Sequence, residues 1–578
     1  MFNRYFQQEL NHLKDLGAEF AKMHPAVAPM LSGLSTDPDV ERVLEGVAFL
    51  TALMRQKLDD DFPEIIHELF QLIWPHYLRP LPSTAIVVFS PKTNLKQTVK
   101  VPKGVQLASE PVDGTACLFR TCYDVDVHPL SIQEANLEEK PGRPPAIRMV
   151  LTLQDLKLEE WQPQSLRFYL AGLPTQAADI YLLLRNHLKQ IVLNPMDGAG
   201  TACILTPDHL QPAGFGLTED VIPYPSQSFP GYRIIQEYFI LPEKFLFLDL
   251  HGWSNWTARG SGSRLEIRFE LKKMPFTPPR VRKSSFELGA TPVINLFTHD
   301  ADPIRLDHRQ SQYAVRPAGS DGRNYQVYSV QKVTGFIQGT ARERSYSPFE
   351  TFSPDPEGNP TYHVKIRQSP IHQRFDFHLS VAYPPAEGTP APETLSMQLL
   401  CTNGLLPEGL RIGDICHPTS STPEFVDFKN IRPPTASILP PLGGNMLWKL
   451  ISNLCLNYQS LAKVDNLRAV LELYNFEENR DRSSFLANQK RIAGIQKIHT
   501  RSANRLVDRV IMRGREIQLD MDQDHFAGEG DLYLFGSILD HFLGSYASMN
   551  TFIQLIVKEV LRGEVYQWPA RIGDQQLI

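Results

Sequence analysis

The sequence predicts an α+β multidomain protein with a helical N-terminal segment, two central β-rich domains of sandwich or barrel type, and a mixed C-terminal domain with helices. Three observations support this prediction. The chain has 578 residues, more than one hydrophobic core usually spans. Apolar residues recur with the helical period near both ends and alternate every second residue between them. The 46 prolines are scattered through the middle of the chain, as in a loop-rich β protein.

Residues 1–83 are predicted to form helices followed by an extended, proline-rich arm. Two helices are predicted before position 60, each with one apolar face. The face of the first comprises Phe2, Phe6, Leu10, Leu13 and Phe20. The face of the second comprises Val40, Val43, Leu44, Val47, Leu50, Met54 and Leu58. A third amphipathic helix has the apolar stripe Phe62, Ile65, Ile66, Leu69, Phe70 and Ile73. Pro75 follows Trp74 and ends this helix, because a proline lacks the N–H that a helix interior needs.

Residues 84–290 and 291–430 are the two predicted β-rich domains. At Thr84 the period of the apolar residues changes from 3.6 to 2, and glycine and proline interrupt the alternating segments. A helix is expected to cross the first of these domains at 177–194. A second, at 232–239, is expected to end before Pro242 and to lead into a strand.

Residues 431–578 form the predicted C-terminal domain. Helices are expected at 445–462, 532–546 and 550–561. The last of these has Asn550 as a candidate N-cap, and its apolar residues at helical spacing are Ile553, Ile556, Val557 and Val560.

The segment 480–515 is unusually basic for this chain. It holds ten basic residues against two acidic ones, a difference of +8 within a chain of net charge −6. Nucleic acid is one interpretation, but Phe485 is the only aromatic residue there for base stacking. We favour docking to an acidic partner surface, with a merely solvated face as the alternative.

Known motifs for chemistry are incomplete in this sequence. His67-Glu68 lacks the second histidine of a zinc protease, because position 71 is Gln71. Asp520, Asp522 and Asp524 begin like a calcium loop, but the required glycine and glutamate are replaced. The acidic run at 59–61 is expected to be a solvated helix cap. We therefore expect no catalytic, metal or cofactor site and no enzymatic activity.

The composition also indicates where the protein is located and which classes of partner are excluded. The small net charge argues against a general nucleic-acid binder. The six cysteines form no C-x-x-C pair, which fits a reducing cytoplasm. The chain begins without a signal-peptide pattern, and no run of about 18 apolar residues predicts a membrane-spanning helix.

Five segments, in the same order and spread over nearly the whole chain, resemble the TssF family, a baseplate subunit of bacterial type VI secretion systems. They are LMRQKLDDDFPEIIHELFQLIWPHYLRPLPS, GYRIIQEYFILPEKFLFLDL, TPVINLFTHDADPIRLDH, LLCTNGLLPEGL and FGSILDHFLGSYASMNTFIQL.

The resemblance implies a structural, non-enzymatic role. Members of this family are similar to wedge proteins of contractile phage tails. Two copies bind one TssG to form a wedge, TssK adaptors link the wedge to the membrane complex, and TssE connects it to the sheath. Six wedges surround the spike hub. The implied location is the cytoplasm of a Gram-negative bacterium, in a baseplate docked to the inner-membrane complex.

We expect apolar stripes near both ends and the basic segment to contact these partners. The candidate interface residues are Phe62, Ile66, Leu69, Ile73, Trp74, Arg501, Arg505, Arg509, Ile553, Ile556 and Val560. Each stripe packing within its own domain is the alternative. Two other functions stay open at this point: a wedge protein of a phage tail, and a carbohydrate-active enzyme with paired carboxylates in a β cleft.

Overall fold

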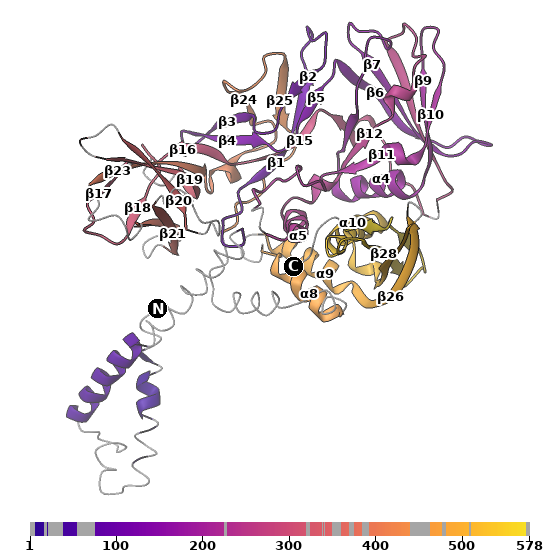
Figure 1. The fold of residues 1–578 in the computed structure, drawn as a ribbon. Coiled ribbons are helices and arrows are strands. Elements are labelled where there is room, and N and C mark those ends of the chain that lie inside the picture. The colour runs from indigo at the N-terminus through magenta and orange to yellow at the C-terminus, as the bar shows by residue number, and fades with distance from the viewer. Residues whose placement is uncertain are drawn as a thin grey trace. The chain divides into compact units, whose positions relative to one another are not determined.

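The computed structural model is α+β and rich in strands (Figure 1). It describes residues 6–7, 9–14, 16, 20, 38–54, 76–224, 228–274, 276–319, 324–337, 339, 342–349, 360–368, 375–383, 392–439, 463–476, 481–507 and 510–573. The chain divides into two compact units. The first comprises residues 1–78 and 441–448, and the second comprises residues 79–440 and 449–578.

The described part of the first unit is mostly helical. Helical residues at 6–7 and 9–14 precede helical residues at 38–54, the first of which is the predicted separator Pro38. The Nζ atom of Lys14 lies 3.2 Å from Oε1 of Glu41, so an exposed ion pair joins the two helical stretches. Both helical predictions are confirmed for the described residues. The predicted third helix lies outside them.

The second unit contains a six-stranded sheet whose strands come from distant parts of the chain. Its order is β24-β3-β4-β15-β1-β25. The strands are β1 (Thr84–Pro91), β3 (Gln106–Val112), β4 (Thr115–Thr121), β15 (Ala290–Ile294), β24 (Ile415–Pro418) and β25 (Val426–Asn430). Strands β2 (Val99–Val101) and β5 (Val125–Val127) form a separate pair. Val87, Phe89, Phe119, Val293 and Phe428 belong to the core cluster of this region.

Two further sheets follow in the chain. One has the order β10-β9-β13-β7-β6, with β6 (Leu130–Glu138), β7 (Ala146–Leu153), β9 (Leu188–Pro195), β10 (Cys203–Leu205) and β13 (Arg264–Leu271). The other has the order β11-β12-β8-β14, with β8 (Leu166–Leu170), β11 (Leu210–Ala213), β12 (Phe247–Leu250) and β14 (Phe286–Leu288).

Two helices belong to this part of the chain, α4 (Pro174–Asn186) and α5 (Pro230–Ile240). Both begin with a proline at a position where a missing N–H costs nothing. The predicted helix at 232–239 is therefore confirmed, and the strand β12 follows it after a 3-10 turn at Pro242–Phe245. The helix predicted at 177–194 is wrong in its second half, because the chain leaves α4 at His187 and continues as strand β9.

All strands of the sheet at residues 297–402 come from one continuous stretch of the chain. Its order is β16-β23-β19-β20-β21-β22-β18, with β17 also pairing with β23. The strands are β16 (Phe297–Asp300), β17 (Ile304–Leu306), β18 (Tyr313–Val315), β19 (Gln326–Ile337), β20 (Glu343–Pro348), β21 (Thr361–Gln368), β22 (Phe375–Ala382) and β23 (Glu393–Thr402). Along the chain, this stretch lies between β15 and β24, two strands that both belong to the six-stranded sheet.

Two buried asparagines hold the ends of this insertion together. Asn295 Nδ2 donates to Oδ1 of Asn403 at 2.7 Å, and the backbone N–H of Asn403 donates to Oδ1 of Asn295 at 2.7 Å. Oδ1 of Asn403 also accepts from the N–H of Leu118 in β4 at 3.0 Å. The pair thus ties the start and the end of the insertion to the six-stranded sheet.

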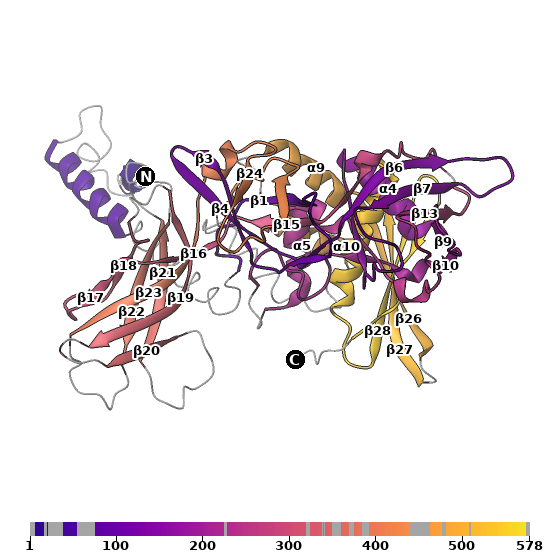
Figure 2. The ribbon, with the colours of Figure 1, turned by 90° about the horizontal axis from the view of Figure 1, so that it is seen from above.

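The C-terminal section combines helices with one mixed sheet. It contains α8 (Val464–Leu473), α9 (Arg482–Ala493), β26 (Ile495–Val507), β27 (Val510–Met521), α10 (Glu529–Gly544), β28 (Thr551–Glu559), β29 (Val565–Gln567) and β30 (Arg571–Ile572). Strands β26 and β27 form a long antiparallel hairpin, and β28 joins β27 in parallel. Parallel neighbours need a crossover, which α10 supplies. Figure 2 shows the two hairpin strands side by side.

One helical prediction is confirmed here and one is wrong. The helix expected at 532–546 is α10, nearly all of whose residues are buried. The helix expected at 550–561 is instead the strand β28, and Asn550 has a φ of 61° rather than an N-cap geometry. The helix expected at 445–462 lies outside the described residues. Residue 290, a predicted domain boundary, lies in β15, and the four-domain division stays a prediction.

Candidate partner-binding surface

Arg501 and Arg505 lie on one face of β26, four residues apart, and differ in what they contact. Arg501 lies directly opposite Glu516 of β27 and forms an ion pair with it. Its side chain is 75% exposed. The Arg505 guanidinium donates to Oε1 of Gln554 in β28 and lies 5.6 Å from the ring centroid of Phe552. Arg501 is therefore available to a partner, whereas Arg505 also fastens the hairpin to β28.

The end of the hairpin exposes two apolar side chains that the sequence analysis missed. Leu506 and Ile511 pair in register and are 72% and 71% exposed. Arg513, also exposed, lies two residues further along β27. Apolar residues on both sides of positions 508–509 in the sequence were the available signal. An exposed apolar pair bordered by cations has the composition of a protein-binding site.

The positive charge of the segment 480–515 is partly neutralised within the fold. Arg491 of α9 donates to Oδ2 of Asp531 in α10 at 2.9 Å, and Arg501 pairs with Glu516. Asp481 caps α9 by accepting from the N–H groups of Ser483 and Ser484, both at 3.1 Å. These contacts, and the presence of only one aromatic residue, Phe485, within the segment, favour a protein partner over nucleic acid.

The three predicted interface residues of the C-terminal apolar run do not form one surface. Ile553 is 5% exposed within β28, Ile556 is half-buried, and Val560 is 51% exposed just after the strand. The helical stripe that united them in the prediction does not exist. Val560 is the one of the three that a partner could reach freely.

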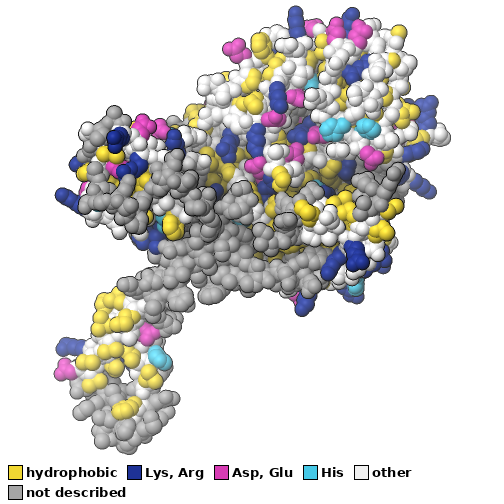
Figure 3. Space-filling view, in the orientation of Figure 1, with side chains coloured by type: hydrophobic (Ala, Val, Ile, Leu, Met, Phe, Trp, Pro, Cys, Tyr) yellow, Lys and Arg dark blue, Asp and Glu magenta, His cyan; other side chains and the backbone are white. Residues whose placement is uncertain are grey.

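The helix at 38–54 carries a stripe of exposed apolar side chains. Val43, Leu50 and Met54 are 64%, 57% and 65% exposed, while Ala48 and Ala52 are buried. Figure 3 shows hydrophobic side chains, in yellow, on the surface of the N-terminal part of the chain. Apolar residues at positions 43, 47, 50 and 54 share one helix face, so the helix presents a hydrophobic strip that no described residue covers.

Some predicted residues lie outside the described part of the chain. They are Phe62, Ile66, Leu69, Ile73, Trp74 and Arg509. The same is true of His67-Glu68 and of the acidic run at 59–61. The interface role of these residues stays a prediction. Of the acidic triplet, Asp522 is described as capping a 3-10 turn, where Oδ1 accepts from the N–H of Asp524 at 3.0 Å.

A cleft of about 800 Å³ lies where the six-stranded sheet meets the β6 and β14 edges. Its carboxyl groups include those of Asp124 and Glu287. A hydrogen bond from Lys100, at 2.8 Å, lowers the pKa of Asp124. Burial raises the pKa of Glu287, and Lys429 and Lys283 oppose that rise. Each of these two carboxyls thus has lysine charges near it, and that of Asp124 forms an ion pair with Lys100.

Comparison with known proteins identifies the family. A family model described as "Type VI secretion system, TssF" matches residues 1–575. The chain belongs to the TssF family. A curated relative, "Type VI secretion system component TssF1" of Pseudomonas aeruginosa, is 30% identical over 621 aligned residues, which cover 99% of this chain and 98% of the relative.

Chains in two solved structures share this fold. A chain in a cryo-electron microscopy structure of the type VI secretion system TssK-TssF-TssG baseplate subcomplex matches with a TM-score of 0.77 and 28% identity, covering 92% of this chain and 98% of that chain. A chain in a baseplate complex from the type VI secretion system matches with a TM-score of 0.62 and 24% identity over the full length of both chains. The second likeness shows the fold alone.

The segments that resemble the TssF family supply buried polar contacts of the fold. The segment 291–308 contains Asn295 and the segment 399–410 contains Asn403, which form the asparagine pair. The segment 231–250 forms α5, whose Glu237 accepts from the N–H of Val221 at 2.7 Å and pairs with the buried Lys244. In this TssF-family chain these recognisable segments therefore maintain the scaffold.

Proposed function

We propose that this chain is a structural wedge subunit of a type VI secretion baseplate without catalytic activity. Family membership over residues 1–575 supports this proposal. The observation that carries it is the likeness, over 92% of this chain, to a chain of a TssK-TssF-TssG baseplate subcomplex. The partners proposed for this chain are TssG, with two copies of the chain per TssG, and TssK. TssE and the spike hub are proposed on the resemblance alone.

The exposed side chains give the proposal a physical basis. The strip at positions 43, 47, 50 and 54 is suited to pack against an apolar face of a partner helix, because burial of such a strip contributes about 25 cal/mol per Å². The hairpin with Arg501 and the exposed Leu506 and Ile511 is suited to an acidic surface with an apolar centre. The proposed location is the cytoplasm, in a baseplate docked to the inner-membrane complex. In the described part of the chain no helix is long and apolar enough to cross a membrane.

Co-expression with the TssG of the same genome tests this proposal. We expect a stable complex of two copies of this chain with one TssG, measured by size exclusion and native mass spectrometry. A chain that stays monomeric in the presence of TssG would contradict the wedge assignment and would direct attention to the cleft.

Two matched variants test the apolar strip in the same assay. The double substitution Val43→Asp and Leu50→Asp places charges on the strip and should reduce complex formation at least tenfold. The control is Ile204→Asp, at an apolar residue of similar exposure (65%) in the edge strand β10. Equal loss with both variants, or loss with neither, would show that the strip is not part of the interface.

A further inference from the structure

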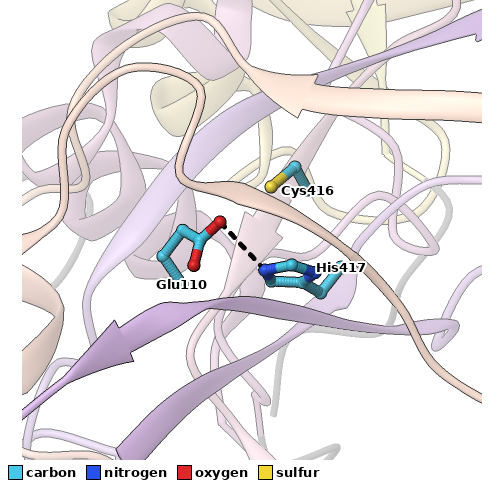
Figure 4. A group of neighbouring side chains, drawn as sticks. All are labelled: Glu110, Cys416 and His417. Atoms are coloured by element: carbon cyan, nitrogen blue, oxygen red, sulfur yellow. Dashed lines mark ion pairs between the residues drawn. The ribbon is translucent and has the colours of Figure 1, made fainter. Parts of the chain in front are cut away.

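Three side chains with metal-binding atoms gather at the edge of the six-stranded sheet, where β24 pairs with β3. They are Glu110 of β3 and the consecutive residues Cys416 and His417 of β24 (Figure 4). Their ligand atoms all lie within 4.8 Å of one another. Oε1 of Glu110 is 3.0 Å from Nε2 of His417.

A β-bulge makes this arrangement possible. Neighbouring residues of a regular strand point to opposite faces of a sheet, so Cys416 and His417 would normally diverge. Here the register shifts between Ile415, opposite Ser109, and His417, opposite Ala108, which leaves Cys416 as the extra residue. Bulges redirect side chains in this way. The N–H of Glu110 donates to the backbone carbonyl of Asp414 at 2.8 Å and holds β3 beside the bulge.

The chemistry of the cluster suits a cation of borderline softness. A thiolate, an imidazole and a carboxylate are the three ligand types of zinc, whereas calcium and magnesium prefer oxygen alone. The carboxylates of Glu110 and Asp414 both lie near the Cys416 thiol, and their negative charge attracts a cation to the cluster.

We propose that Glu110, Cys416 and His417 bind one Zn²⁺ ion, with the fourth tetrahedral position open to water. Zinc bonds of about 2.0–2.3 Å separate neighbouring ligand atoms by roughly 3.3–3.7 Å. The carboxylate–imidazole distance of 3.0 Å is close to that value and the thiol lies within 4.8 Å of both groups, so side-chain rotation would complete the site. Binding forms the Zn–S, Zn–N and Zn–O bonds and releases the thiol proton to solvent, with no change of oxidation state.

The alternative is a plain surface ion pair. Glu110 and His417 are each about half exposed, and such pairs contribute at most about 1 kcal/mol. The ion pair between Glu110 and His417 would form equally well if the Cys416 thiol pointed to the other face of the sheet. The bulge at Cys416 is the feature that the ion pair leaves unexplained. A bound ion would also fasten the edge strand β24 to β3.

Cobalt substitution of the purified, reduced full-length chain tests the proposal. Titration with Co²⁺ should give one equivalent of a complex with a sulfur-to-cobalt charge-transfer band, and Zn²⁺ should displace it. Cys416→Ser should abolish the band. Cys203→Ser, at another half-buried cysteine, is the matched control and should keep it.

A second variant and a second readout keep the test decisive. His417→Ala, at an exposed position, should weaken Zn²⁺ binding by more than the roughly 10–100-fold that loss of an outer-shell partner costs. Zn²⁺ should raise the melting temperature of the unsubstituted chain and not that of this variant. Absence of the charge-transfer band, its persistence in Cys416→Ser, or equal Zn²⁺ affinity in His417→Ala would overturn the site and leave the baseplate proposal untouched.

Discussion

Single buried polar residues hold distant parts of this chain together. Asn295 and Asn403 are fully buried and satisfy each other and the backbone of β4. Asp540 of α10 accepts from Nε of Arg571 at 2.6 Å, and the same guanidinium contacts Nε2 of His541. A buried polar group without a hydrogen-bond partner lowers the free energy of unfolding, so substitution of each residue has a predictable effect on stability.

The substitution Asn403→Ala should lower the free energy of unfolding by at least about 2 kcal/mol. It leaves the N–H of Leu118 and the amide of Asn295 without their partner, and each unsatisfied buried group costs ~1–3 kcal/mol. Chemical denaturation measures the change, and Asn136→Ala at an exposed position of β6 serves as control. Equal stability of the two variants would contradict this role.

Asp540 should make stability depend on pH in the acid range. Burial raises its pKa to about 6 from 3.8, and Arg571 opposes that rise. A carboxyl whose pKa is raised on folding stabilises the protein below its unfolded pKa, and this contribution is lost as the pH rises through 6. The difference in unfolding free energy between the unsubstituted chain and Asp540→Asn should therefore fall by up to roughly 3 kcal/mol from pH 4 to pH 7.5.

Denaturation of both chains at the two pH values measures that difference. The comparison isolates Asp540, since the neighbouring His541, Arg571 and Arg185 are present in both chains. His541, whose pKa is lowered by burial, would make stability fall in the opposite direction, as the pH drops. A constant difference would show that Asp540 has an ordinary pKa.

At the scale of elements, the sequence predicted several helices more clearly than the buried strand β28. The helix 38–54, α5 and α10 were predictable from spacing, proline and length. The strand β28 was not. It lies inside its sheet, between β27 on one side and β29 and β30 on the other, and both of its faces carry buried residues. The strand therefore lacks the alternation of apolar and polar residues that marks a half-buried strand. The spacing of Ile553, Ile556 and Val560 instead matches that of a helical stripe.

The strand assignment predicts unequal effects along the former stripe. Ile553→Ala should cost about 2–4 kcal/mol, because a buried isoleucine leaves a cavity. Val560→Ala, at a half-exposed position, should change the unfolding free energy by less than about 0.5 kcal/mol. Thermal and chemical denaturation measure both. Similar costs at the two positions would favour the helical stripe.

Substitutions of Arg501 and Arg505 in β26 should have different effects, one on partner binding and the other on stability. Arg501→Ala should cost about 1 kcal/mol of stability, since the Arg501 side chain is 75% exposed, yet should weaken partner association at low salt. Arg505→Ala should destabilise the hairpin more, because Arg505 contacts both Gln554 and Phe552. Melting temperatures and association constants with TssG or TssK at two salt concentrations distinguish the two effects. Unchanged association in Arg501→Ala would remove this residue from the interface.

At the scale of the whole molecule, the sequence predicted the α+β class, and the resemblance predicted the family. It did not predict that β1 pairs with β25, more than 300 residues later. Such pairings depend on tertiary packing and leave no local pattern. The cluster of Glu110, Cys416 and His417 was missed for the same reason, because it depends on the long-range pairing of β24 with β3 and on a bulge.

Deletion of residues 2–54 should leave the second unit folded. That unit has its own sheets and core clusters, so we expect a cooperative thermal transition close to that of the full chain. Association with TssG should be lost, because the exposed strip is removed. Circular dichroism and size exclusion check both outcomes. A deletion that still binds TssG would place the main contact in the second unit.

The interrupted six-stranded sheet has a consequence for how the chain is made on the ribosome. Strands β1, β3, β4 and β15 emerge first, but β24 and β25 are synthesised only after the whole of 297–402. The inserted sheet needs no later strand and is free to fold while the outer strands of the first sheet are still absent. During that interval β1 and β3 present open edges in a nascent chain, and a slow or misfolded insertion would prolong their exposure to other polypeptides.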